Sequence, residues 1–188
     1  MDKDIKISIL KSTIKVFNKK GLKLTMDDVT DYMGISKKTI YKYFDSKEQI
    51  FEQIVDYIFD DIKRREKEII SEEGLSLEAR TRKLLSAFPE RFTEIDFTKL
   101  GDLKGKYPKV YKKMKKRLES GWEPTLELLK KGQDEGLFRK DADLMIFKTM
   151  MDASVARFFE ADTLRKNKIS YVDALNQVVD ILLSGIKA

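Results

Sequence analysis

The amino-acid sequence predicts an all-α protein with a short three-helix head and a longer helical bundle. Only 3 Pro and 9 Gly interrupt its 188 residues, of which 37% are charged and 41% hydrophobic. Such a composition favours long amphipathic helices over folds made of strands and turns. Apolar residues also recur every three or four positions, which is the spacing of one helix face. We expect the head to cover residues 1–46 and the bundle residues 47–188.

The head is predicted to hold three helices. An apolar stripe over residues 7–17 predicts the first. A capping box at residues 25–28 opens the second, because its two side chains can each bond the other residue's backbone N–H. Gly34 ends that helix in a tight turn, and Ser36 can cap a third helix over residues 37–44.

The bundle begins with a long helix. A second capping box, at residues 46–49, opens it, and its apolar stripe continues to about Ser71. A further helix is expected over residues 77–87, before Pro89, whose ring cannot donate a backbone hydrogen bond.

The rest of the bundle is predicted to hold three more helices. One spans residues 108–133 with a bend near residues 121–122. Asp141 or Asp143 caps the next, which runs to residue 161, and a third capping box at residues 170–173 opens the final helix. The whole chain is expected to contain about nine helices.

Positive charge gathers in two regions. The net charge is +6, yet residues 1–50 carry +4 and residues 104–117 carry +8, so the remainder is acidic. A clustered basic face is typical of a surface that binds polyanions. We expect residues 104–117 to form a solvated helix face. A second nucleic-acid contact there is the open alternative.

Residue types that are missing exclude many function classes. The chain has no Cys and no His, which excludes disulfides, Ser-His triads and ordinary structural zinc sites. No constellation of carboxylates, Lys or Tyr suggests catalysis, so we expect no enzyme, metal or cofactor. No apolar stretch is long enough to span a membrane, and a cytoplasmic protein is expected.

The head has the pattern of a helix-turn-helix, whose second short helix can enter a major groove of DNA. Its lysines supply cations, Thr39 a short hydroxyl, and its tyrosines phenols that reach phosphate. Lys47 begins the long helix, where free backbone N–H groups favour phosphate. The expected DNA contacts are Thr25, Ser36, Lys37, Lys38, Thr39, Tyr41, Lys42, Tyr43 and Lys47.

Many positions at fixed spacing carry a family resemblance. They are residues 17–21, 24–25, 29, 34–36, 39–41, 43–44 and 46–48. With them, residues 5–55 resemble the N-terminal DNA-binding domain of the TetR family of transcriptional regulators. Lys38 departs from the pattern, because the family commonly has a small residue there. The resemblance implies a homodimer that reads a palindromic operator in double-stranded DNA, with a C-terminal domain that senses a small molecule.

Aromatic and Met side chains after residue 85 recur at helical spacing, and most must be core. The same types line apolar pockets between helices. The expected effector contacts are Phe92, Tyr111, Met114, Trp122 and Met151. Carboxylates such as Glu94, Asp96, Glu119, Glu123 and Asp152 would favour a cationic ligand if buried, although surface exposure is the expected state of each.

The last two predicted helices carry an apolar arc wider than one core contact needs. A helix that is apolar on more than one face is usually buried on more than one side. We therefore predict a four-helix dimer interface. Its predicted residues are Phe147, Met151, Val155, Phe158, Leu175, Val179 and Leu182. The alternative is a monomer that covers both faces internally.

Taken together, the patterns and the family resemblance lead us to expect a ligand-responsive, sequence-specific, DNA-binding transcriptional regulator that acts as a dimeric repressor. Residues 1–46 would bind DNA, and residues 47–188 would sense the ligand and dimerise. The alternative function is a helical interaction protein, or a nucleic-acid binder without sequence preference or effector control.

Overall fold

The structure is a computed structural model that describes residues 2–89, 95, 97–160 and 163–188. Apart from an antiparallel bridge between Phe138 and Lys187, the regular structure of these residues is helical. The predicted all-α class is confirmed. The elements are α1 (Asp2–Lys20), the 3-10 turn η1 (Gly21–Lys23), α2 (Met26–Met33), α3 (Lys37–Tyr41), α4 (Lys47–Ser71), α5 (Leu77–Leu85), the 3-10 turn η3 (Phe97–Asp102), α6 (Leu103–Lys106), α7 (Pro108–Glu119), α8 (Glu123–Asp134), α9 (Leu144–Glu160), α10 (Thr163–Asn167) and α11 (Tyr171–Ile186).

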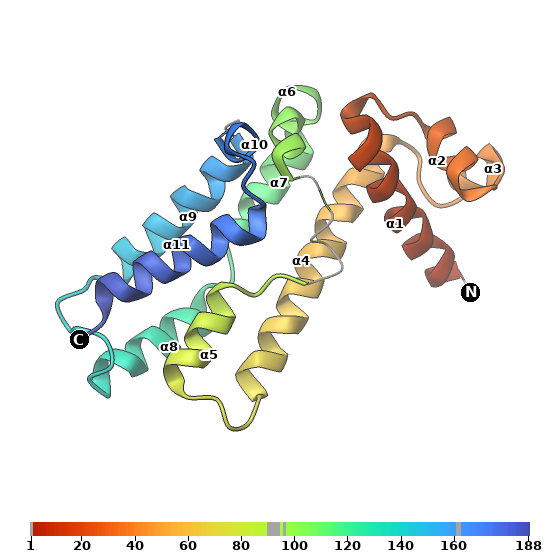
Figure 1. The fold of residues 1–188 in the computed structure, drawn as a ribbon. Helices are drawn as coiled ribbons and strands as arrows, with labels where there is room; N and C mark the ends of the chain where they lie inside the picture. The colour runs from red at the N-terminus through yellow and green to blue at the C-terminus, as the bar shows by residue number, and fades with distance from the viewer. Residues whose placement is uncertain (1, 90–94, 96, 161–162) are drawn as a thin grey trace.

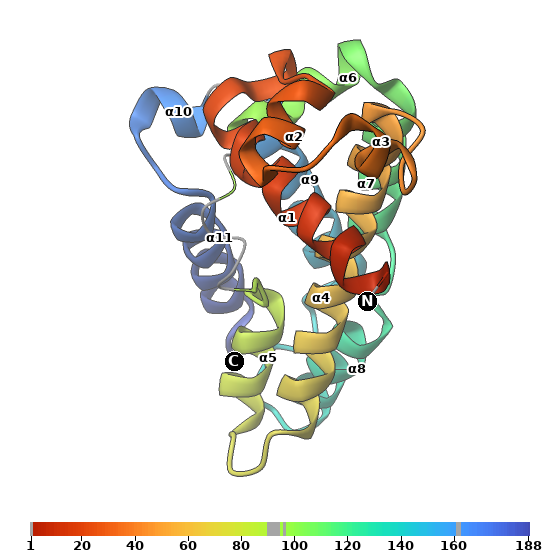
Figure 2. The same cartoon turned by 90° about the vertical axis from the view of Figure 1, so that its right-hand side faces the viewer.

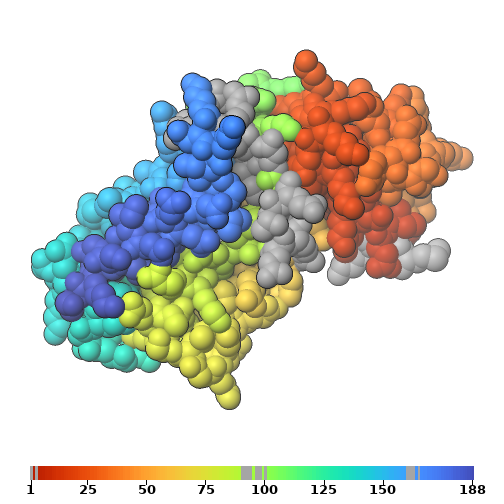
Figure 3. Space-filling model, in the orientation of Figure 1, coloured from red at the N-terminus to blue at the C-terminus, as the bar shows by residue number. Residues whose placement is uncertain are grey.

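The helices form a head and a body that share the long helix α4 (Figures 1 and 2). The head consists of α1, η1, α2 and α3. Helix α4 begins beside the head and runs to the far end of the body, where it packs against α5. Helices α9 and α11 pack together on the side of the body away from the head. In the space-filling view the head projects from one end of the molecule (Figure 3).

Local capping signals set most helix starts, as predicted. The hydroxyl of Thr25 accepts from the N–H of Asp28 at 3.2 Å, and the carboxylate of Asp28 accepts from the N–H of Thr25 at 2.8 Å. The hydroxyl of Ser46 likewise accepts from the N–H of Gln49 at the start of α4, and the hydroxyl of Ser170 accepts from the N–H of Asp173 at the start of α11. Of the two candidates for α9, Asp143 is the cap, because its carboxylate accepts from two N–H groups of the first turn.

Two helix predictions were wrong in their bounds. Helix α3 ends at Tyr41 instead of residue 44, because the chain turns back and the N–H groups of Tyr43 and Phe44 both donate to the carbonyl of Ile40. The single bent helix predicted over residues 108–133 is two helices, α7 and α8. They are separated at Gly121, whose φ of 75° lies in the left-handed region that favours glycine.

One apolar core extends from the head into the body. Ile9, Phe17 and Phe44 of the head belong to the same buried cluster as Phe51 of α4 and Val110 of α7. The rings of Phe17 and Phe51 meet edge to face with centroids 5.9 Å apart. A fully buried side chain of this size contributes about 1.5–3 kcal/mol. The head is therefore held to α4 by packing.

A second core closes the far end of the body. It gathers buried side chains from α5, α8, α9 and α11 around Leu129 and Val179, both of which are fully buried. The side-chain amide of Gln133 donates to the carbonyls of Arg139 and Ala142, which fixes the turn between α8 and α9. These contacts give the body a rigid end opposite the head.

Candidate nucleic-acid interface and internal cavity

Helix α3 presents a polar face above an apolar anchor. Ile40 and Phe44 are buried beneath it, whereas Lys37, Lys38 and Tyr41 are exposed. Half of the surface of Tyr41 is open to solvent. Since only one side of α3 packs on the head, its other side is free to meet a partner.

The start of α3 is stabilised by its own hydroxyls. The Ser36 hydroxyl accepts from the N–H of Thr39 at 3.1 Å and lies 2.8 Å from the Thr39 hydroxyl. Gly34 supplies the preceding turn with a φ of 65°. The sequence-predicted candidates Ser36, Lys37, Lys38, Thr39, Tyr41 and Lys42 are thus brought together on one short helix and its ends.

Several of these candidates have acidic neighbours in the absence of DNA. Lys37 pairs with Asp27 at 2.8 Å, and that hydrogen bond raises the pKa of Lys37. The hydroxyl of Tyr43 donates to Asp2 at 2.8 Å, which raises the pKa of the phenol. The ammonium group of Lys38 makes no ion pair or hydrogen bond within the described part of the chain, so it is available without breaking a contact.

The structure contradicts the expectation for Lys47. Its ammonium group does not point outward but donates to the carbonyls of Leu22 and Leu24, at 3.4 and 2.5 Å. Burial lowers the pKa of Lys47, and the nearby Asp28 carboxylate opposes that effect. Two further lysines act in the same way: Lys99 donates to the carbonyl of Asn18 and Lys106 to that of Leu22. Lys47 belongs to this head-body junction.

The basic segment of residues 104–117 is partly engaged within the chain. Lys113 pairs with Asp56 at 2.6 Å and Arg117 with Asp60 at 2.5 Å, both on α4. These two ion pairs, and the bond from Lys106 to the head, show that part of the positive charge of this segment serves contacts within the chain. A nucleic-acid contact of this segment stays a prediction.

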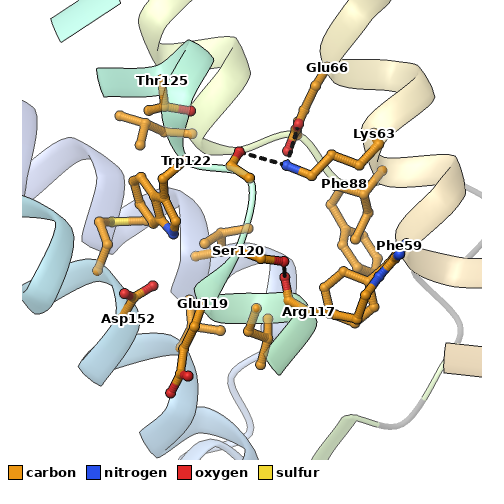
Figure 4. A pocket seen from close by; sticks show the side chains of 18 of the residues that line it. Phe59, Lys63, Glu66, Phe88, Arg117, Glu119, Ser120, Trp122, Thr125 and Asp152 are labelled. Carbon is orange, nitrogen blue, oxygen red and sulfur yellow. Dashed lines mark hydrogen bonds and ion pairs between the residues drawn. The ribbon is translucent and has the colours of Figure 1, made fainter. Parts of the chain in front are cut away.

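A cavity of about 150 Å³ lies inside the body, bounded by α4, α5, α7, α8, α9 and α11 (Figure 4). Of the expected effector contacts, Trp122 and Met151 line it. Met114 lines an adjoining space of about 60 Å³ instead. Tyr111 packs on the core but lines neither space, and Phe92 lies outside the described residues.

Sequence reasoning missed the wall that α4 contributes to this cavity. Phe59, Ile62 and Lys63 line it from α4, and Phe88 lines it from the segment after α5. The apolar stripe of α4 was visible in the sequence, but a stripe does not reveal whether it meets solid core or an open space.

The predicted dimer residues divide into two sets. Four of them, Phe147, Met151, Leu175 and Val179, are core residues of a single chain and are at most 5% exposed, so their assignment to an interface was wrong. Val155, Phe158 and Leu182 are half-buried. The large apolar side chains exposed on these two helices are instead Met145, Ile146 and Met150 of α9 and Ile181 of α11.

Comparison with known proteins agrees with this geometry. Residues 9–54 match the family model described as "Bacterial regulatory proteins, tetR family". The N-terminal domain of the chain belongs to the TetR family. The match covers most of α1, η1, α2, α3 and the first turns of α4, and so includes α3, which presents the exposed polar face.

Relatives match over nearly the whole chain. An uncharacterized HTH-type transcriptional regulator, YvaF of Bacillus subtilis (strain 168), is 25% identical over 181 residues, with 96% of this chain and 94% of YvaF covered. A TetR transcription regulator from Haloarcula marismortui has the same fold, with a TM-score of 0.75, 16% identity and coverage of 99% of this chain and 100% of that one. The regulator FadR from Bacillus subtilis, solved in complex with stearoyl-CoA, has a TM-score of 0.61, 19% identity and coverage of 96% and 98%.

The chain has the fold of a DNA-binding regulator with a TetR-family N-terminal domain, and its relatives are transcriptional regulators and not enzymes. Among the described residues, no helix is both long and apolar enough to cross a membrane.

Proposed function

We propose that this protein is a dimeric repressor that binds a palindromic operator through α3 and releases it when a small molecule enters the cavity in its body. The observation that carries the proposal is the exposed face of α3, held by the buried Ile40 and Phe44 at the projecting end of the head. In this proposal residues 1–46 bind DNA and residues 47–188 sense the ligand and dimerise.

The DNA contacts follow from exposure. We assign base contacts to Lys37, Lys38 and Thr39 at the start of α3, where a helix in the major groove meets base edges. Tyr41, Lys42, Tyr43 and the N-terminal end of α2 at Thr25 are assigned to phosphates. Lys47 is left out of this set because its ammonium is bound inside the protein.

The dimer contact is proposed on the exposed apolar side chains of α9 and α11. Met145, Ile146, Met150 and Ile181 are each 50% or more exposed, which is unfavourable for side chains of this size in water. Two copies related by a two-fold axis would cover them and would place two α3 helices about 34–36 Å apart, the spacing of successive major grooves.

Helix α4 provides the coupling between ligand and DNA. Its Phe59 and Ile62 line the cavity, and its first turn is bonded to the head through Lys47. A ligand that prefers a different tilt of α4 changes the spacing of the two heads. A coupling of about 1–3 kcal/mol would weaken operator affinity by about 5- to 150-fold.

The test is selection of duplexes from a random pool, with and without a panel of small molecules. We expect the selected duplexes to share a palindrome and to be released by at least one compound. Equal affinity for selected and random duplexes would instead support a nucleic-acid binder without sequence preference.

A further inference from the structure

Two adjoining spaces in the body indicate the chemistry of the ligand as well as its place. The cavity shown in Figure 4, here called the outer chamber, shares part of its wall with the smaller space, the inner chamber. Phe59, Ile62, Phe88, Leu118 and Tyr171 line both. These side chains form the wall between the two spaces, so a molecule seated in the outer chamber reaches the inner one only by passing between them.

The inner chamber accepts hydrocarbon only. Apart from the phenol of Tyr171, the side chains that line it are aliphatic, aromatic or Met. Ile54 and Ile58 of α4 form one wall, and Met114 of α7 lies on another. Because a polar group placed there would lose its water without finding partners, the part of a ligand that reaches this space must be apolar.

The charged groups of the outer chamber are already neutralised. Every charged residue in its wall has a partner of opposite sign. The pairs are Lys63 with Glu66 at 2.7 Å, Arg117 with Asp60 at 2.5 Å, Lys148 with Asp152 at 2.5 Å, and Lys115 with Glu119 at 3.8 Å. A charged ligand would have to break one of these pairs, and neither an unpaired cation nor an unpaired carboxylate is offered to it among the described lining residues.

Two uncharged polar groups of the outer chamber have no such partner. The Thr125 hydroxyl and the Trp122 indole N–H line the chamber (Figure 4) and make no hydrogen bond within the described part of the chain. Thr125 is only 8% exposed as a residue, but its hydroxyl oxygen keeps some accessible surface toward the chamber, because Arg80 Nε is the one fully buried unpaired side-chain atom of the described residues. Neither group has a partner within the described part of the chain, so a ligand that enters the chamber can bond to both in place of water.

We propose that the ligand is an uncharged amphiphile, with one hydroxyl or carbonyl group and a hydrocarbon chain. Its polar group bonds to Thr125 and Trp122 in the outer chamber, and its chain passes Phe59 and Phe88 into the inner chamber. This inference rests on the proposed function, in which the cavity holds the effector.

Trp122 supplies a direct readout, because it is the only tryptophan of the chain. Its fluorescence can be followed during titration with decanol, decanoate and decyltrimethylammonium, which share a chain and differ in charge. The two ions are used below their micelle concentrations and decanol below its solubility limit, with the circular dichroism signal as a check on folding. We expect decanol to bind about tenfold more tightly than either ion. Equal or tighter binding of an ion would overturn the proposal.

Two substitutions, one in each chamber, locate the two ends of the ligand. Thr125→Val keeps the size of the side chain and removes its hydroxyl, so decanol should bind about tenfold more weakly. Ile54→Phe fills the inner chamber and should shift the preferred alcohol from decanol toward hexanol. Ile70→Phe, on the exposed side of the same helix, is the matched control and should keep the original preference. An unchanged length profile in a folded Ile54→Phe protein would overturn the assignment of the chain.

Operator release, measured separately, distinguishes the two proposals. If decanol changes Trp122 fluorescence but leaves the operator bound, the ligand class stands and the effector role fails. If a charged compound binds in the cavity and releases the operator, the effector role stands and the ligand class fails.

Discussion

The ammonium group of Lys47 donates to the carbonyl oxygen of Leu24 at 2.5 Å, and this bond joins the first turn of α4 to the end of η1. Lys47→Met should remove it while keeping much of the apolar stem. We expect a loss of about 1 kcal/mol in the free energy of unfolding, measured by urea denaturation.

The same variant tests the role of Lys47 toward DNA. Because its ammonium is bound inside the protein, the salt dependence of operator affinity should not change. Lys42→Met is the comparison, since Lys42 is exposed and its nearest acidic partner, Asp2, is 3.9 Å away. Its salt slope should fall by about 0.9, the value for one phosphate contact. A flatter slope for Lys47→Met would restore it as a phosphate ligand.

The capping box of α2 should make the stability of the head depend on pH. The Lys20 ammonium, and after it the N–H of Thr25, lowers the pKa of Asp28 below its ordinary 3.8. A carboxyl with a lowered pKa stabilises the fold above its unfolded value, and the contribution is lost as the pH falls through the folded value. Asp28→Asn should therefore lower the urea midpoint at pH values above about 4, and the difference from the wild type should shrink below that. A difference that stays constant down to acid pH would contradict this account.

Asp27 is expected to reduce the affinity for DNA. Its carboxylate pairs with Lys37 at 2.8 Å, and both side chains are more than half exposed. Lys37 must leave this pair to reach a base. Exposed pairs of this kind are weak, so Asp27→Asn should tighten operator binding only about two- to fivefold. The double variant Asp27→Asn with Lys37→Ala should show no such gain, and fluorescence anisotropy with a labelled duplex measures both. A gain that persists in the double variant would mean that Asp27 acts by repelling phosphate.

The exposed side of α9 provides a test of assembly. Met150 is 50% exposed, and Met150→Glu would place a charge in the proposed interface. We expect a monomer by analytical ultracentrifugation, together with loss of binding to a palindromic duplex. The control is Ile70→Glu, an exposed apolar residue on α4, which should leave the dimer intact. A dimer in both variants would show that the interface does not include Met150.

The sequence predicted those parts of the fold that depend on neighbouring residues. The capping boxes at Thr25 and Ser46 and the glycine turn at Gly34 work over three or four positions, so their outcome can be read locally. The end of α3 could not be predicted in this way. It is decided by Phe44, which turns back to reach a core assembled from distant helices.

The sites were predicted less completely for a related reason. On α9, Met150 and Met151 are adjacent and of the same type, yet one is exposed and the other is 3% exposed. The sequence of an apolar arc does not show which of its side chains are buried within the same chain and which stay exposed. Lys47 shows the same limit for charge, because only the folded structure brings the carbonyls of Leu22 and Leu24 to its ammonium.

Gly132 offers a test of packing that opposes helix propensity. It lies in α8, where alanine would ordinarily be favoured by about 1 kcal/mol. A Cβ atom there would come within 2.3 Å of the ring of Phe138, which is 2% exposed and cannot move aside without disturbing the core. Gly132→Ala should therefore destabilise the protein, by about 1–3 kcal/mol, the usual range for overpacking. Gly185→Ala is the matched control in α11, where a Cβ atom meets nothing within 4 Å, so that variant should be as stable as the wild type or more so. Urea midpoints that rise in both variants would show that the Phe138 ring yields, and that the end of the body is less rigid than its packing indicates.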